Sequence, residues 1–184
     1  MEVILVDNKA LAEELEALQF ALKTEQDGYA YYSDASSRTN HAVAKRFFAS
    51  LADDEKEHIS LIKEFHASMQ ESPEGSEVQL PDLPGDPRKS LVTIFEEAKK
   101  EIDHNVPADT GILGVYRHAM DLEDKAAKYY EQRRDASPFE RARKFFDWLF
   151  HFENYHYQMI SDSLSYLENP EQWYQDYERS IFEG

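Results

Sequence analysis

The sequence predicts an all-α protein, and within that class a four-helix bundle made of two antiparallel helical hairpins joined by a long crossover. Three observations lead to this fold. The 184 residues include only 6 Gly and 7 Pro, too few for a fold with many β-turns. Apolar residues recur at alternating steps of three and four, which marks one buried face of a helix. Finally, the sequence repeats itself after 98 residues, so each half is one hairpin.

The helix boundaries follow from this periodicity and from the Pro and Gly positions, within one domain over residues 1–184. The first hairpin, 8–70, has helices over about 8–37 and 41–70. The second hairpin, 109–167, has a helix over about 109–136 and another up to about 167. The last helix is expected to start at a capping box formed by Ser137 and Glu140, with Pro138 as its first residue.

Two segments lie outside the hairpins. Residues 71–108 form the crossover, where Asp86 followed by Pro87 predicts the start of a short extra helix over about 88–103. Residues 168–184 form a C-terminal tail. Its Asn169-Pro170 pair repeats the same start signal and predicts a C-terminal turn that contains Trp173.

The internal repeat carries a motif of polar residues. Residues 21–66 align with 119–164 without a gap. Each copy has a Glu, a Tyr seven residues later, and an E-x-x-H motif that begins thirty residues after the first Glu. The first copy has Glu25, Tyr32, Glu55 and His58, and the second has Glu123, Tyr130, Glu153 and His156. Two such copies suggest two hairpins related by a pseudo-twofold axis.

These glutamates fall on the buried stripes of the helices. The first stripe, for example, runs through Leu18, Leu22, Glu25, Tyr29 and Tyr32. An unpaired buried ion costs several kcal/mol, so four carboxylates in one core must be protonated or neutralised by cations. No Lys or Arg lies near them on the stripes.

Two divalent metal ions would supply the missing charge. Their +4 balances four carboxylates, and two neutral imidazoles complete the coordination. The i, i+3 spacing of E-x-x-H places a carboxylate and an imidazole on one helix face, where both can bind one ion. The glutamates of the first and third helices would either bridge the two ions or cap one of them. The predicted ligands are Glu25, Glu55, His58, Glu123, Glu153 and His156.

The duplicated motif resembles that of the rubrerythrins, a branch of the ferritin-like superfamily. The resemblance covers about residues 8–167 and implies a ferritin-like four-helix bundle with the six residues above as ligands of two iron ions. Manganese or zinc are possible substitutes for iron. It also implies that Tyr32 and Tyr130 hydrogen-bond to ligand carboxylates, that the protein is a homodimer, and that it reacts with O2 or hydrogen peroxide. The preceding residues, Tyr31 and Tyr129, are read either as packing residues or as electron relays.

The chain departs from full-length rubrerythrins at two points. It contains no Cys and therefore no rubredoxin-type iron centre, so electrons would come from an external donor such as a rubredoxin. Those proteins also have a further Glu three residues after the third-helix ligand, where this chain has Ala126. The extra Glu accompanies fast peroxide reduction in the family, so its replacement argues against an efficient peroxidase.

Composition narrows the possible partners and location. The formal charge of −17, from 37 acidic and 20 basic residues, disfavours binding to nucleic acid. No apolar stretch approaches the ~20 residues of a membrane span, and the N-terminus has no basic segment typical of a signal peptide. We therefore expect a cytoplasmic protein that binds neither nucleic acid nor membranes.

Three functions are consistent with these features. The leading interpretation is a di-iron oxidoreductase that reacts with O2 or peroxide and receives electrons from a separate protein. The second is an iron-handling protein of the ferroxidase type, which oxidises Fe(II) itself. The third is a non-enzymatic interaction module that uses the metal only for stability.

Overall fold

The computed structural model describes residues 8–75, 79–99 and 110–183. The regular elements of these segments are all helices, which confirms the predicted all-α class. The helices are α1 (Asn8–Arg38), α2 (Ala42–Glu71), α3 (Pro87–Lys99), α4 (Thr110–Ala136), α5 (Glu140–Glu168) and α6 (Pro170–Glu183).

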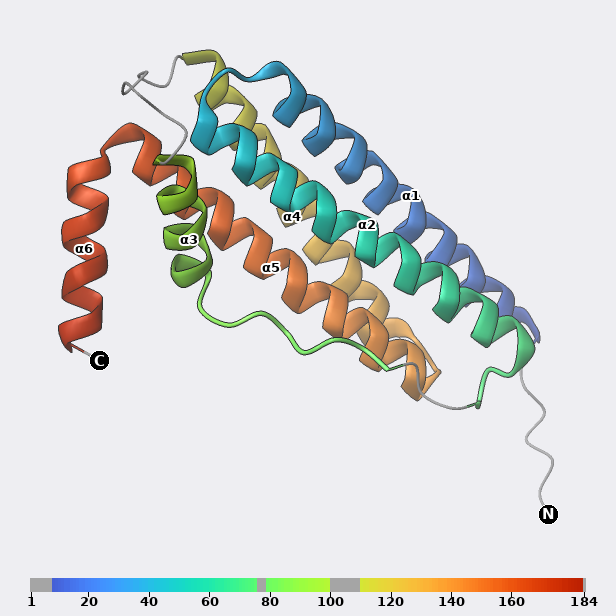
Figure 1. Cartoon of the computed structure of the whole chain (residues 1–184). Coiled ribbons are helices and arrows are strands. Elements are labelled where there is room, and N and C mark those ends of the chain that lie inside the picture. Colours follow the sequence, from blue (N-terminus) through green and yellow to red (C-terminus); the bar gives the residue numbers. More distant parts are fainter. Residues whose placement is uncertain (1–7, 76–78, 100–109, 184) are drawn as a thin grey trace.

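The four long helices form the bundle. In Figure 1, α1, α2, α4 and α5 lie side by side, with α1 packed along α2 and α4 packed along α5. The segment before α3 runs along the bundle from one end towards the other, and α3 then packs against α2 and α5. Helix α6 packs against α5 and lies outside the four-helix core. This is the two-hairpin arrangement that the sequence predicts.

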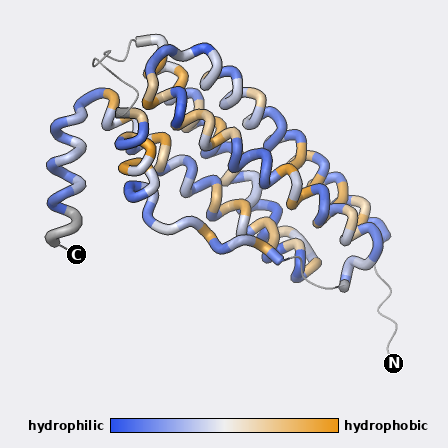
Figure 2. The backbone as a smooth tube through the Cα atoms, viewed as in Figure 1, coloured by the Kyte–Doolittle hydropathy of each residue, from blue (hydrophilic) through white to orange (hydrophobic). Residues whose placement is uncertain are grey.

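The core has two apolar clusters with a polar layer between them. Hydrophobic and hydrophilic residues alternate along each long helix, as they do in amphipathic helices (Figure 2). One cluster includes Phe48, Leu51 and Tyr116 and continues onto α3 and α6. The other includes Phe65 and Phe146. On every long helix, the predicted metal ligands lie between residues of the first cluster and residues of the second.

Two helix starts follow the predicted chemistry. Asp86 Oδ1 accepts a hydrogen bond of 3.0 Å from the backbone N–H of Arg88, so α3 begins at Pro87. The part of this helix that was predicted beyond Lys99 lies outside the described residues. Asn169 Oδ1 accepts a hydrogen bond of 3.2 Å from the Gln172 N–H. The predicted C-terminal turn is instead a helix of 14 residues, and its Trp173 is buried against α3 and α5.

The start of α5 differs from the prediction. The helix begins at Glu140, with Phe139 rather than Ser137 as its N-cap residue. The Ser137 hydroxyl donates a 2.7 Å hydrogen bond to Glu14 Oε2 and accepts one of 3.2 Å from the Phe139 N–H. Because Glu14 on α1 holds this hydroxyl, Ser137 fixes the turn before the helix and does not cap the helix itself.

The predicted stripe on α1 also needs a correction at one position. Tyr29 is 39% exposed, so it does not belong to the buried face. The stripe passes instead from Glu25 through Gly28 to Tyr32. A Cβ atom at Gly28 would lie 3.4 Å from Glu55 Cδ, so this position of α1 faces the Glu55 side chain of α2.

Candidate metal centre

The structure brings all six predicted ligands together in the middle of the bundle. Each of the six side chains is at most 3% exposed. They come from all four long helices: Glu25 from α1, Glu55 and His58 from α2, Glu123 from α4, and Glu153 and His156 from α5.

The six residues form two overlapping groups. Within each group, one ligand atom per residue lies within 4.8 Å of the others. Glu55 and Glu153 belong to both groups, whereas Glu25 and Glu123 each belong to one. Glu25 and Glu123 would therefore each serve one metal position, whereas the two E-x-x-H glutamates could serve both. The groups are Glu25, Glu55, His58 and Glu153, and Glu55, Glu123, Glu153 and His156.

The donor atoms fit a pair of divalent cations. Among the described residues, His156 Nδ1 and Glu153 Oε1 are buried without a hydrogen-bond partner. His156 Nδ1 nevertheless lies 3.4 Å from Glu55 Oε1 and 3.8 Å from Glu123 Oε2. The ion pairs that the described part of the chain gives these carboxylates involve only His58 and His156. Carboxylate oxygen and imidazole nitrogen donors are ligands that iron, manganese and zinc accept.

Without metal, burial and close packing shift the pKa values of the four carboxyl groups. Burial and the negative charge of Glu25 raise the pKa of Glu55 to about 8. Burial, followed by the charges of Glu25 and Glu123, raises the pKa of Glu153 well above its usual range. Burial alone would also raise the pKa of Glu25, but hydrogen bonds with Glu55 and His58 lower it to about 2. The same balance, with Glu153 and His156 as partners, lowers the pKa of Glu123.

The two imidazoles also take up protons. Burial lowers the pKa of His58, but its hydrogen bonds with Glu25 and Glu55 outweigh burial and raise the pKa to about 9. Burial likewise lowers the pKa of His156, but the carboxylates of Asp54, Glu123 and Glu55 outweigh burial and raise the pKa. The raised pKa values of Glu55, Glu153, His58 and His156 all favour the protonated form, and a metal ion would compete with protons for these four groups.

Tyr32 and Tyr130 lie where the resemblance places them. The Tyr32 hydroxyl donates a hydrogen bond to Glu123 Oε1, and the Tyr130 hydroxyl donates one to Glu25 Oε1. Each bond joins α1 to α4. Burial and the adjacent carboxylates raise both phenol pKa values well above 10, so both groups stay neutral and act as donors. The two bonds are related by the 98-residue repeat.

Tyr31 and Tyr129 form a second related pair of hydrogen bonds. The Tyr31 hydroxyl donates to the Val115 carbonyl at 2.9 Å, and the Tyr129 hydroxyl donates to the Ala17 carbonyl at 3.0 Å. Both hydroxyls thus bond to the backbone of the opposite hairpin. This geometry favours the packing interpretation over an electron relay.

A cavity of about 270 Å³ reaches the carboxylates from between α1 and α4. Gly28 and Ala126, which occupy equivalent positions of the repeat, both line it, so the cavity lies on the pseudo-twofold axis. Phe20, 55% exposed, lies in contact with Tyr129, and both residues also line the cavity. A small molecule entering here would meet the shared glutamates Glu55 and Glu153.

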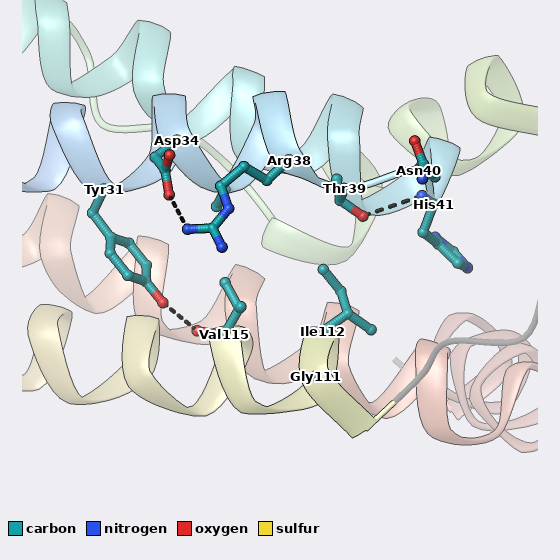
Figure 3. Close-up of a pocket in the computed structure, with 10 residues that line it drawn as sticks. Tyr31, Asp34, Arg38, Thr39, Asn40, His41, Gly111, Ile112 and Val115 are labelled. Atoms are coloured by element: carbon teal, nitrogen blue, oxygen red, sulfur yellow. Dashed lines mark hydrogen bonds and ion pairs between the residues drawn. The ribbon is translucent and has the colours of Figure 1, made fainter.

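A larger cavity of about 530 Å³ lies elsewhere, beside the α1–α2 turn and the start of α4 (Figure 3). Its lining includes the Asp34–Arg38 ion pair and the Tyr31 hydroxyl, but none of the six predicted ligands. Its size alone therefore does not make it the functional site.

Sequence reasoning missed two carboxylates with defined roles. Glu14 is fully buried and paired with Arg133, with 3.4 Å between Oε1 and Nη2. Asp54 lies 3.3 Å from His156 Nε2, on the side of the imidazole that faces away from the cluster. Asp54 immediately precedes a predicted ligand, but its contact with α5 depends on how the helices pack.

Comparison with known proteins agrees with this geometry. The family model of rubrerythrin matches residues 16–164, which include all six predicted ligands. No curated protein and no solved structure matches the chain significantly. The match spans most of the sequence, and the chain therefore belongs to the rubrerythrin family.

Proposed function

We propose that the protein is a di-iron oxidoreductase that reduces O2 or hydrogen peroxide with electrons from an external donor such as a rubredoxin. The observation that carries the proposal is the pair of overlapping ligand groups at the base of an open cavity. Glu25, Glu55, His58, Glu123, Glu153 and His156 would hold two iron ions. Iron bound there supplies the oxidant-binding and electron-transfer chemistry that side chains alone lack.

The surrounding residues would restrict and orient this chemistry. Tyr32 and Tyr130 hold the carboxylates of Glu123 and Glu25 by hydrogen bonds, so neither can rotate freely. The two apolar clusters above and below the polar layer exclude water along the bundle axis. Access is then through the cavity between α1 and α4, where a small oxidant fits and a protein does not.

Electron supply and assembly complete the proposal. The chain has no Cys for an iron–sulfur centre, so a separate protein would deliver electrons. The homodimer and the cytoplasmic location stay predictions. Among the helices of the described residues, none combines the length and the apolar character that crossing a membrane requires.

Rapid mixing of the reduced, iron-loaded protein with H2O2 or O2 tests the function. We expect one rapid oxidation seen by absorption, then no further turnover until reduced rubredoxin is added. His58→Ala and His156→Ala should each slow the reaction strongly, because each removes a nitrogen donor. His151→Ala is the control, since His151 lies on α5 but is exposed to solvent.

The other two functions predict different outcomes. Turnover that is sustained by fresh Fe(II) but not by reduced rubredoxin would support the iron-handling protein. No reaction of the loaded protein with either oxidant would leave the metal-stabilised interaction module.

Ala126 provides a second test of the same site. Its side chain lines the cavity, so Ala126→Glu would add a carboxylate where the family pattern has one. We expect faster peroxide reduction if this missing carboxylate limits the rate. Ala126→Gln, with nearly the same volume and no charge, is the matched control.

A further inference from the structure

The two imidazoles of the candidate centre differ in what contacts their outer nitrogen atoms. Both rings turn Nδ1 towards the carboxylates: His58 Nδ1 lies 2.9 Å from Glu25 Oε2, and His156 Nδ1 lies 3.4 Å from Glu55 Oε1. On the other side, His156 Nε2 lies 3.3 Å from Asp54 Oδ2. His58 Nε2 is buried, and the described residues give it no hydrogen-bond partner.

Two aromatic rings pack against the His58 imidazole. The Phe152 ring lies 4.5 Å from the imidazole at an interplanar angle of 82°, and the Trp148 ring lies 5.3 Å away at 81°. The indole Nε1–H of Trp148 points elsewhere, since it donates a 2.8 Å hydrogen bond to the Pro81 carbonyl. The imidazole of His58 thus packs against aromatic rings, and neither ring supplies an acceptor for its buried Nε2.

This difference arises at one pair of equivalent positions. The 98-residue repeat that aligns His58 with His156 also aligns Asp54 with Phe152. The hydrogen bonds of Tyr32 and Tyr130 are equivalent in the two halves of the repeat, so the halves are alike on the inner side of the cluster. The carboxylate partner of one imidazole is therefore replaced by an aromatic ring at the other.

A carboxylate behind a ligating imidazole has known physical effects. It accepts the outer N–H, which fixes the tautomer with its lone pair on the inner nitrogen, holds the ring orientation and raises its basicity. Loss of such a partner typically lowers metal affinity by about 10- to 100-fold. His58, when it binds a metal through Nδ1, must instead bury an N–H with no acceptor in the described structure, which weakens it as a ligand.

We propose that Asp54 is a positioning residue that makes the two metal positions unequal. The position beside His156 binds a divalent cation more tightly and fills first, and the position beside His58 fills second. The inference rests on the proposed metal centre but not on any particular oxidant or electron donor, because it concerns only the affinity of each position.

Anaerobic titration with Co(II) alone, followed by calorimetry and by visible absorption, tests this order. Wild-type protein should bind two equivalents in two steps whose dissociation constants differ by about tenfold or more. The His58→Ala variant should keep the tighter position, and the His156→Ala variant should keep the weaker one. Asp54→Asn should weaken the tighter step by about 10- to 100-fold, so that the two steps merge.

Two controls separate positioning from a general structural effect. Asp53→Asn removes the same charge one residue away, at an exposed side chain, and should leave both steps unchanged. Asp54→Asn added to His156→Ala should also have no effect, because the imidazole on which Asp54 acts is gone. Far-UV circular dichroism confirms that each variant is folded.

Several outcomes would overturn the proposal. Two equal steps in the wild-type protein would show that the positions do not differ. An equal weakening of both steps by Asp54→Asn would mean that Asp54 supports the bundle rather than one imidazole. Failure of the wild-type protein to bind Co(II) at all would overturn the metal centre itself, and with it this inference. Unequal binding without any reaction towards oxidants would instead contradict only the proposed function.

Discussion

The bundle buries carboxylates in two regions that handle the negative charge differently. Near one end, Glu14 is fully buried, but Arg133 lies 3.4 Å from it and the Ser137 hydroxyl donates a 2.7 Å hydrogen bond. In the middle, the ion pairs that the described residues form with the four carboxylates involve only two histidines. A buried acid is therefore not in itself a sign of a metal site. The sign is a group of buried acids for which the protein supplies no permanent cation.

The largest contrast between the two regions should appear when metal is added. Free Mn(II) at about 1,000 times its dissociation constant stabilises the folded state by about 4 kcal/mol for each ion. For a chain of this size we expect the melting temperature to rise by roughly 10 °C or more. Glu55→Gln should lose most of this rise because Glu55 belongs to both ligand groups, whereas Glu14→Gln should keep it. Differential scanning calorimetry with and without Mn(II) measures the rise in melting temperature of each variant. An equal loss of this rise in the two variants would show that the two regions do not differ in metal binding.

The pH dependence of the metal-free protein should be the next largest effect. Folding raises the pKa of Glu55 from its ordinary value near 4.5 to about 8, and that of His58 from 6.5 to about 9. Groups with raised pKa values stabilise the folded state fully below their unfolded pKa, and this contribution is lost as pH rises through the folded value. Glu25, lowered to about 2, acts in the opposite sense, but its contribution is already complete above pH 4.5. The free energy of unfolding should therefore fall between about pH 5 and 9.

Urea unfolding in the presence of a chelator measures this slope, which amounts to about 1.4 kcal/mol per pH unit for each net proton. Metal-loaded protein should not share the decline, because metal displaces these protons. Calorimetric titrations at pH 7 in buffers of different ionisation enthalpy should accordingly detect proton release on metal binding. If the metal-free protein instead became more stable as the pH rose over this range, the raised pKa values of Glu55 and His58 would be contradicted.

A matched pair of charge removals should have unequal effects on the metal-free protein. Glu14→Gln removes the partner of Arg133, whose side chain is about one-quarter exposed, and should cost roughly 1–2 kcal/mol. Glu153→Gln removes a carboxyl whose charged form is disfavoured, because burial and neighbouring acids raise its pKa. It should therefore leave stability unchanged or increase it at pH 8. Urea unfolding measures the stability of the two variants. A larger loss of stability in Glu153→Gln than in Glu14→Gln would contradict this expectation.

The smallest effects should come from the phenol groups. Tyr32→Phe and Tyr130→Phe each remove one hydrogen bond to a ligand carboxylate, which should cost about 1 kcal/mol of stability. The two losses should be similar because the two bonds are equivalent in the repeat. Tyr29→Phe is the control, since Tyr29 is exposed. A large difference between the first two variants would show that the inner sides of the two halves are less alike than their hydrogen bonds suggest.

Most of the fold was predictable because its signals are local. Stripes of apolar residues, and starts such as Asp86-Pro87, depend only on neighbours in the chain. The errors came from residues whose surroundings belong to other helices. Ser137 matches a capping box, but Glu14 on α1 holds its hydroxyl. The apolar pattern assigned Tyr29 to the buried face of α1 because Tyr29 has a large side chain. The residue that occupies the buried face there is Gly28, which has no side chain for the pattern to detect.

The clustering of the six residues was predictable from the sequence, but its geometry was not. The two E-x-x-H motifs and their equal spacing are visible in one dimension, and the six side chains do meet. Which glutamates are shared between the two positions depends on the relative heights of the four helices. The contact of Asp54 with His156 likewise crosses from α2 to α5 and has no counterpart in the spacing of the motif.

The covalent link between the two hairpins has a consequence for how such a centre can change. A bundle assembled from two identical hairpins would carry every substitution twice, so its two ions would have to remain equivalent. Here one chain contains both hairpins, and a change in one leaves the other untouched. Asp54 in the first hairpin and Phe152 in the second show that this independence has been used. A single chain with two copies of a motif can therefore give the two histidines of one site different surroundings.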